Sequence, residues 1–286
     1  MDRLIYIGEN VEGWVLSMKV REIINAILTY SCGGMKFERT CDLLISGDYD
    51  MEVRGICTTF MATVEVIEKA IKLGVNLIIT HEPTYYTSVD KLDWLKNDPI
   101  YLLKKKIIDE NKIAIWRFHD HMHAAPGDLI YRGLIREIGW ENYLIQGEAF
   151  PCCYEIPEMS LQELAQFFKQ KLKMEVIRVV GSLNNRCKRV GILVGGGSLG
   201  LGVEEMPMML MREQNLDVMV CGEINEWTLC PYVRDASALG MNKALLILGH
   251  ERTEEFGMKY LAEWLKPLVD DIPVYFIDSK EPFSYI

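Results

Sequence analysis

The sequence predicts an α/β fold composed of two related α/β lobes. Short, continuous apolar runs alternate with helical patterns along the chain, as expected for strands that are buried on both faces of a sheet. One order of elements also occurs twice, once in each half of the sequence. The length of 286 residues, with 49% hydrophobic and 25% charged side chains, is ordinary for a folded protein of one large domain or two smaller ones.

The strands are predicted from short apolar runs. These runs are continuous rather than alternating, which is typical of interior strands in an α/β sheet. They comprise residues 43–46, 53–60, 75–80, 113–118, 189–194, 217–221, 243–248 and 273–277.

The helices are predicted from apolar side chains that recur on one face and from capping residues. Thr63 and Thr253 are predicted N-caps, Gly74 is a C-terminal stop, and Ser160 with Glu163 forms a capping box. The helices are expected at residues 19–30, 63–73, 128–138, 160–172, 225–239 and 253–265.

The repeated order is strand, helix, glycine, strand, histidine, glutamate. It ends at His81-Glu82 in the first half and at His250-Glu251 in the second. This repeat predicts lobes at residues 1–139 and 158–286 that face one another and share one site, with an irregular connection at 140–157. Convergence on a common α/β pattern is the alternative explanation.

Charge and composition argue against several classes of protein. The formal net charge is −10, and the only basic run, 104–106, is expected to be a solvated helix face, so no broad nucleic-acid surface is predicted. No apolar run approaches the roughly 20 residues that span a bilayer. The chain opens without a signal-peptide pattern, and its eight cysteines form no CxxC pair. We therefore expect a cytoplasmic protein with reduced thiols.

All five histidines directly follow apolar strands. They are His81, His119, His121, His123 and His250, and the first histidine of each segment is followed by a carboxylate. Ligand sites in open α/β sheets form at the carboxyl ends of strands. Imidazole and carboxylate are the usual ligands of zinc, iron, manganese and nickel, so this distribution predicts a divalent metal site. The alternative for each histidine is an ordinary hydrogen-bonded residue.

Two further features allow alternative interpretations. Glu254 is expected in the first turn of the last helix, where it could reach the site or only complement the helix dipole. The glycine-rich segment 195–198 follows a strand and could cradle a phosphate. It has no P-loop lysine, and an ordinary tight turn fits it better.

Six ordered motifs resemble the NIF-three family (NGG-one-interacting factor three), which is also known as GTP cyclohydrolase I type 2 or dinuclear-metal hexameric protein. The resemblance covers nearly the whole chain. The motifs are Gly-Asp-Tyr-Asp-Met-Glu-Val at 47–53, Thr-His-Glu-Pro at 80–83, His-Asp-His-Met-His at 119–123, Gly-Gly-Gly-Ser at 195–198, Gly-Glu-Ile-Asn-Glu at 222–226 and Gly-His-Glu-Arg-Thr-Glu at 249–254.

The resemblance implies five metal ligands, which are His81, Glu82, His123, His250 and Glu254. Two of these depart from the family pattern, because Glu82 stands where the family has histidine and His123 where it has aspartate. The total of three histidines and two carboxylates is unchanged. An imidazole cannot bridge two metals, so a second metal would need Glu82, Glu254 or Asp120 as the bridge.

The resemblance also implies a function and an assembly. One or two divalent metals would support hydrolysis of a phosphorylated or nucleotide-like small molecule, and a homohexamer is expected. His119, Asp120 and His121 are candidate catalytic residues for acid–base chemistry, or they orient the metal ligands. The alternative is a metal-stabilised scaffold or regulatory protein that binds a partner and has no enzymatic activity.

Overall fold

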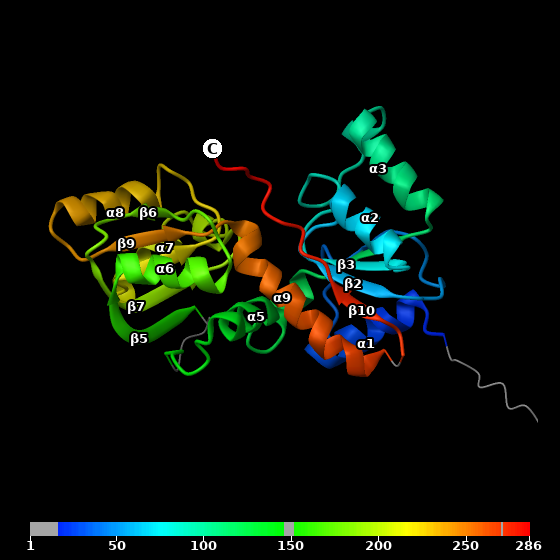
Figure 1. The fold of residues 1–286 in the computed structure, drawn as a ribbon, viewed down its shortest axis with the longest axis horizontal. Coiled ribbons are helices and arrows are strands. Elements are labelled where there is room, and N and C mark those ends of the chain that lie inside the picture. The colour runs from blue at the N-terminus through cyan, green and yellow to red at the C-terminus, as the bar shows by residue number, and fades with distance from the viewer. Residues whose placement is uncertain (1–16, 146–151, 270) are drawn as a thin grey trace, which may run out of the picture.

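The computed structural model describes residues 17–145, 152–269 and 271–286 and has a mixed α/β fold with two five-stranded sheets (Figure 1). Residues 146–151 of the predicted irregular connection lie outside the described residues. The first lobe, as the term is used below, is the sheet ordered β1-β4-β3-β2-β10 with its helices, and the second lobe is the sheet ordered β5-β7-β8-β9-β6 with its helices.

In the first sheet, β2, β3, β4 and β10 run parallel and β1 is antiparallel to β4. The strands are β1 (Leu44–Ser46), β2 (Ile56–Thr59), β3 (Leu77–Thr80), β4 (Ala114–Arg117) and β10 (Val274–Phe276). The helices that belong to this lobe or adjoin it are α1 (Val20–Cys32), α2 (Val64–Lys72), α3 (Pro99–Glu110), α4 (Asp120–Ala124) and α5 (Leu129–Ile138), with a 3₁₀ turn at Asp93–Leu95.

In the second sheet, β7, β8 and β9 run parallel, and the outer strands β5 and β6 are antiparallel to their neighbours. The strands are β5 (Cys153–Ser160), β6 (Arg178–Val180), β7 (Arg186–Leu193), β8 (Val218–Cys221) and β9 (Ala244–Ile247). The helices are α6 (Leu161–Lys171), α7 (Met206–Glu213), α8 (Leu229–Ala238) and α9 (His250–Leu265), with 3₁₀ turns at Gly197–Leu199 and Lys266–Leu268.

Alternate residues of the first sheet's strands enter two different cores. Leu77 and Ile79 belong to one apolar cluster with Ile23 of α1, whereas Ile78 belongs to another cluster with Ile67 of α2. The sheet is therefore covered on both faces, which explains the continuous apolar runs in its strands.

Helix α9 connects the two lobes. It starts after β9 of the second sheet and runs to the first lobe, where it contacts β2 and β10 (Figure 1). It also packs closely on α5, because a Cβ on Gly133 would overlap the backbone of α9 at Phe256 and Gly257. The lobes are thus joined by a packed helix as well as by the chain connections.

Every predicted strand is confirmed, while β5 and β6 were not predicted. The edge strand β5 carries Glu155, Pro157 and Glu158 and is exposed along part of its length, so it has no continuous apolar run. It begins inside the segment 140–157 that was expected to be irregular. At the other end of the chain, β10 lies in the first sheet although its residues fall in the predicted second lobe.

Three predictions about individual residues are settled by their contacts. The side chains of Thr63 and Ser160 cap their helices as predicted. Thr253 is not an N-cap, because α9 already begins at His250. The expectation that 104–106 is a solvated face is wrong for Lys104, which is 4% exposed and donates to the carbonyl of Thr84 at 2.6 Å. Among the described residues, no helix combines the length and apolar character needed to cross a membrane.

Candidate metal centre

His81 lies directly after β3 and is completely buried. Its Nδ1 is 3.1 Å from the carbonyl oxygen of Phe118. A carbonyl only accepts hydrogen bonds, so Nδ1 carries the proton and Nε2 presents a lone pair. This Nε2 lies 3.4 Å from Oε2 of Glu254.

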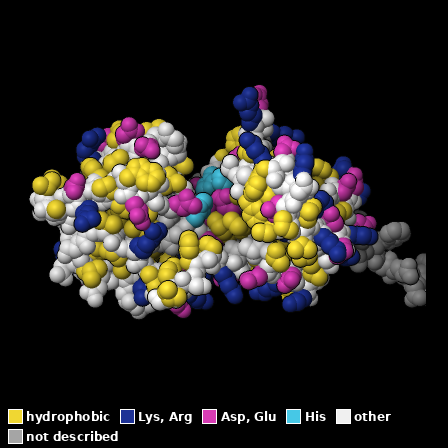
Figure 2. Space-filling model, turned by 90° about the horizontal axis from the view of Figure 1, so that it is seen from above, with side chains coloured by type: hydrophobic (Ala, Val, Ile, Leu, Met, Phe, Trp, Pro, Cys, Tyr) yellow, Lys and Arg dark blue, Asp and Glu magenta, His cyan; other side chains and the backbone are white. Residues whose placement is uncertain are grey.

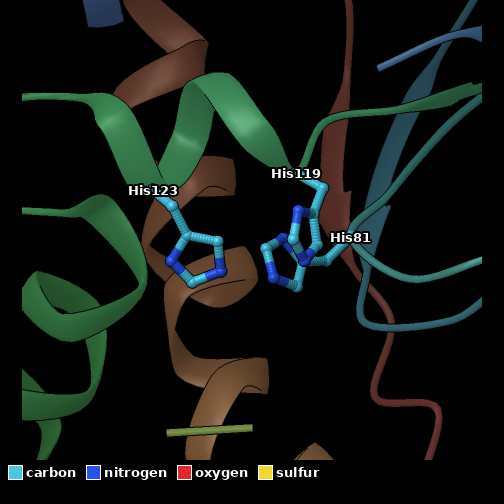
Figure 3. A group of neighbouring side chains, drawn as sticks. All are labelled: His81, His119 and His123. Atoms are coloured by element: carbon cyan, nitrogen blue, oxygen red, sulfur yellow. The ribbon is translucent and has the colours of Figure 1, made fainter. Parts of the chain in front are cut away.

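His119 and His123 face His81 from the short segment that follows β4. His119 precedes α4, and His123 lies four residues later in that helix, so both side chains project to one side. The ring of His81 stacks on that of His119 with centroids 4.5 Å apart, and the ring of His123 lies 5.1 and 4.9 Å from these two rings. Figure 3 shows the three imidazoles turned toward one another. One ring nitrogen from each lies within 4.8 Å of the others, so the three could hold a metal ion.

Two aspartates orient these histidines. Oδ1 of Asp120 is 3.0 Å from Nδ1 of His119, and Oδ2 of Asp128 is 2.8 Å from Nδ1 of His123. A carboxylate on the second nitrogen of an imidazole fixes its tautomer, as is usual for metal-binding histidines. In both residues the Nε2 atom is therefore left available for a ligand.

Helix α9 contributes His250 and Glu254, which lie one turn apart. Nε2 of His250 is 3.0 Å from Oε2 of Glu254 and 3.2 Å from Oε1 of Glu82, which follows His81 in the first lobe. On its other side, Nδ1 of His250 is 3.0 Å from Oε1 of Glu223, the residue after Gly222. The pair from α9 therefore meets the histidines and Glu82 of the first lobe.

The glycine-rich turn after β7 makes room for Glu254. Gly195 has φ +50°, and a Cβ at this position would overlap Oε1 of Glu254 and lie 2.7 Å from Nε2 of His250. Its backbone N–H donates to Oγ1 of Thr253 at 2.9 Å, which ties the turn to α9. This part of the segment 195–198 is thus packed against the side-chain cluster.

Mutual attraction shifts the pKa values of the cluster. Burial alone would raise the pKa of Glu254, but His250 and His81 hold it well below the usual range. Burial alone would lower the pKa of His250, but Glu254 and Glu82 raise it to about 11. Such carboxylates favour a cation beside them, which can be a protonated imidazole or a metal ion that displaces the proton.

The flanking histidines respond differently from one another. Burial lowers the pKa of His119, and the neighbouring His81 and His123 lower it further. Burial also acts to lower the pKa of His123, but Asp128 outweighs it and the pKa is raised. Of these two histidines, His119 is consequently the one that stays neutral more readily.

The structure brings together all five residues that the resemblance implied as ligands, and it adds His119 to them. Asp120 contacts the cluster only through His119. Its carboxylate also accepts hydrogen bonds from Oγ1 of Thr40 and the backbone N–H of Cys41, both at 2.9 Å. His121 lies apart from this cluster. Its Nδ1 is 2.6 Å from Oδ2 of Asp42, and its ring packs on Phe37 at 4.4 Å.

Sequence reasoning did not identify Asp128 or Glu223 as residues that contact the cluster histidines, nor Gly195 as the residue that gives Glu254 its space. Asp128 was predicted only as a helix start, and its Oδ1 does accept from the backbone N–H groups of Ile130 and Tyr131 in the first turn of α5. The signal that could have found it is its spacing of five residues from His123.

Two hollows reach the cluster from different directions. A cavity of about 460 Å³ is bordered by His119 and His123, together with Arg39 and Phe37. A larger cleft of about 1400 Å³ lies between the lobes and is bordered by Glu82 and His250. Figure 2 shows histidines with adjacent acidic side chains in the hollow between the two halves of the molecule.

The chemistry of this cluster suits a divalent transition metal. Nε2 of His81 and Oε2 of Glu254 are buried and make no well-aligned hydrogen bond, although Nε2 of His250 lies 3.0 Å from this Oε2. Leaving such groups without a well-aligned hydrogen bond is costly, and a metal ion would satisfy both. Imidazole nitrogens with carboxylate oxygens are a ligand set for zinc, iron, manganese or nickel.

The sequence profile of Duf34/NIF3 (NGG1p interacting factor 3) matches residues 18–282. The chain belongs to this family. The resemblance seen in the motifs is thereby confirmed. A Clostridium perfringens relative named GTP cyclohydrolase 1 type 2 homolog is 27% identical over 283 residues, which cover 94% of this chain and 100% of the relative.

Solved structures share the NIF3 fold. A Bacillus cereus protein related to NIF3 superposes with a TM-score of 0.71 at 18% identity, covering 94% of this chain and 99% of that one. Staphylococcus aureus hypothetical protein SA1388 gives a TM-score of 0.70 at 23% identity, covering 94% and 100%. At these identities the likeness shows the fold alone.

Proposed function

We propose that this NIF3-family protein binds one or two divalent transition-metal ions and acts as a metal-dependent hydrolase on a phosphorylated or nucleotide-like small molecule. The observation that carries the metal site is the buried pair of Nε2 of His81 and Oε2 of Glu254, which lie 3.4 Å apart and make no well-aligned hydrogen bond. The residues that would hold the metal are His81, Glu82, His123, His250 and Glu254, which leaves Nε2 of His119 free for proton transfer.

Side chains beside the proposed metal ligands would transfer protons during hydrolysis. Bound metal would lower the pKa of a water and polarise the substrate. His119 is 31% exposed at its side chain and borders the smaller cavity, and Asp120 holds its Nδ1. We infer that this pair receives or returns a proton during hydrolysis. His121, which is buried against Asp42, has no such access.

The larger cleft favours a substrate with a ring and an anionic group. Its border includes the aromatic side chains of Tyr86, Phe283 and Tyr285, which offer stacking surfaces. Arg178 and Lys280 border the same cleft and could pair with phosphate. A volume of about 1400 Å³ has room for a nucleotide. The name of the Clostridium perfringens relative refers to a guanine nucleotide, which agrees with this class.

The second candidate function is a cytoplasmic scaffold or regulatory homohexamer whose lobes are joined by metal. The contact of 3.2 Å between Glu82 and His250 favours it, because it couples metal binding to the relation of the two lobes. A metal with every coordination position filled by protein would favour the scaffold, while an open position would favour catalysis.

The test combines metal analysis with a substrate screen. Protein purified without chelator should contain at least one zinc, iron, manganese or nickel ion per chain, and the metallated protein should hydrolyse one member of a panel of nucleotides and phosphoesters. Glu254→Gln should lose both properties. Substoichiometric metal in the wild-type protein would contradict the metal site, whereas full metal occupancy without any turnover would favour the scaffold. Sedimentation of the same samples tests the hexamer.

A further inference from the structure

A second cluster of acidic side chains lies beside the metal centre on a different side of α9. It consists of Glu251 and Glu255, one helical turn apart, and Asp278, which follows β10. One carboxylate oxygen from each lies within 4.8 Å of the others. We call these three residues the carboxylate cluster.

The two glutamates of this cluster are buried, which is rare for acidic side chains. Glu251 is 4% exposed and Glu255 is 2% exposed. Both carboxylate oxygens of Glu251 lack a hydrogen-bond donor. A buried carboxylate that is not compensated carries a large desolvation penalty, so this position demands a positive charge or a proton.

The guanidinium of Arg252 lies beside this cluster, but it is shared among four carboxylates. Nε of Arg252 lies 3.3 Å from Glu251 and 3.1 Å from Glu281, and its Nη1 pairs with Glu255 and lies 4.0 Å from Asp278. One guanidinium therefore faces four carboxylates, which leaves three formal negative charges. Because Arg252 gives Glu251 an ion pair without hydrogen-bond geometry, the Glu251 oxygens stay available.

We propose that Glu251, Glu255 and Asp278 form a second cation site, which takes a hard divalent ion such as calcium, magnesium or manganese. All its donors are carboxylate oxygens, the ligands that these ions prefer, whereas the metal centre described above is rich in imidazole. Asp278 has a side chain that is 42% exposed and gives the ion a route from solvent.

Helix geometry keeps the two sites separate. Glu251 and Glu255 each follow by one residue the pair His250 and Glu254, and one residue turns an α-helix by about 100°. The same helix thus directs one pair toward the histidines and the other toward the segment after β10. Each site can be altered without removing a donor of the other.

The proposed ion would fix one wall of the large cleft. Asp278 opens the C-terminal segment, and residues 279–285 border the cleft. In Figure 1 this segment leaves β10 and passes across the region between the two lobes. Glu281 of the same segment pairs with Arg252 and with the hydroxyl of Tyr285. A cation that joins Asp278 to α9 would therefore hold the segment in place.

The test is calcium titration of the full chain after treatment with chelator and saturation of the histidine centre with zinc. Calorimetry should detect one calcium per chain, with affinity weakened at least tenfold in Asp278→Asn and lost in Glu251→Gln/Glu255→Gln. The unfolding temperature should rise with calcium in the wild-type protein and should not change in the double variant. Glu263→Gln, an exposed acid of α9, is the matched control and should bind calcium normally.

Folding of the double variant is checked by its zinc content, which should equal that of the wild type. The proposal is overturned if calcium, magnesium and manganese all fail to bind the wild-type protein in the millimolar range, because the two glutamates would then share a proton instead. It is equally overturned if calcium binds the double variant Glu251→Gln/Glu255→Gln as tightly as it binds the wild type. Either result would overturn only the second cation site, because zinc binding at the histidine centre is measured separately.

Discussion

The same dipeptide, His-Glu, follows a buried parallel strand in each lobe, but its two copies are arranged differently. After β3, His81 and Glu82 both face the candidate metal centre. After β9, His250 faces it while Glu251 joins the carboxylate cluster, and Glu254 supplies the carboxylate instead.

The segment that follows each strand causes this difference. Pro83 disfavours helical backbone at Glu82, and the N–H of Glu82 still bonds to the carbonyl of Phe60 at 2.9 Å, so the chain stays non-helical. Before the second dipeptide, Gly249 has φ 102° and turns the chain directly into α9, which begins at His250. A helix places residue i+4, rather than i+1, beside residue i. The repeat therefore preserves the histidine position and changes which carboxylate accompanies it.

The largest effect expected from breaking this arrangement is that of Glu254→Ala. Glu254 is the buried carboxylate that lies 3.0 Å from His250 and 3.4 Å from His81, so its loss removes a donor from both lobes. We expect zinc affinity to fall by more than about 100-fold, beyond the loss typical of supporting residues. Competition with a chromophoric chelator measures it, and affinity within tenfold of wild type would mean that Glu254 is not a ligand.

Gly195→Ala tests whether the turn after β7 leaves the space that the Glu254 side chain of α9 needs. The added Cβ would overlap the Glu254 carboxylate and would occupy left-handed backbone, so we expect zinc content to fall at least tenfold, with a lower unfolding temperature. Gly196→Ala is the matched control, because its Cβ would meet nothing within 4 Å. Equal zinc content in the two variants would contradict this role for Gly195.

The pair Glu82→Gln and Glu251→Gln compares the two dipeptides directly. Glu82 lies 3.2 Å from His250, so the first change should weaken zinc binding by about 10- to 100-fold. The second should alter it by less than about twofold, because Glu251 contacts Arg252 and the carboxylate cluster instead. Similar losses from both substitutions would show that the copies are used alike.

The smallest effect on zinc affinity is expected for His121→Gln. His121 lies between the two cluster histidines in sequence, but its ring contacts Asp42 and Phe37. Zinc affinity should stay within about twofold, while loss of the buried contact with Asp42 should lower stability by roughly 1–3 kcal/mol. Urea unfolding and chelator competition on the same protein separate these outcomes, and a large loss of zinc affinity in a folded variant would place His121 in the site.

Much of the local structure could be predicted from the sequence. The apolar runs located all eight predicted strands, and the side chains of Thr63 and Ser160 identified two helix starts. The histidines after strands indicated where a site would form, because strand ends and their order along the chain are set by local patterns. The edge strand β5 was not predicted, because the second half of its length is too exposed to contain a continuous apolar run.

Tertiary structure alone decided which side chains meet. The sequence determined two α/β units with histidines at strand ends, but not that β10 would join the first sheet, that Lys104 would be buried, or that Glu251 would turn away from His250. Gly195 also gained its meaning only from the approach of Glu254. These outcomes depend on contacts between residues far apart in the chain. Strand and helix patterns depend instead on residues that are close in sequence, and only such local patterns can be recognised in a single sequence.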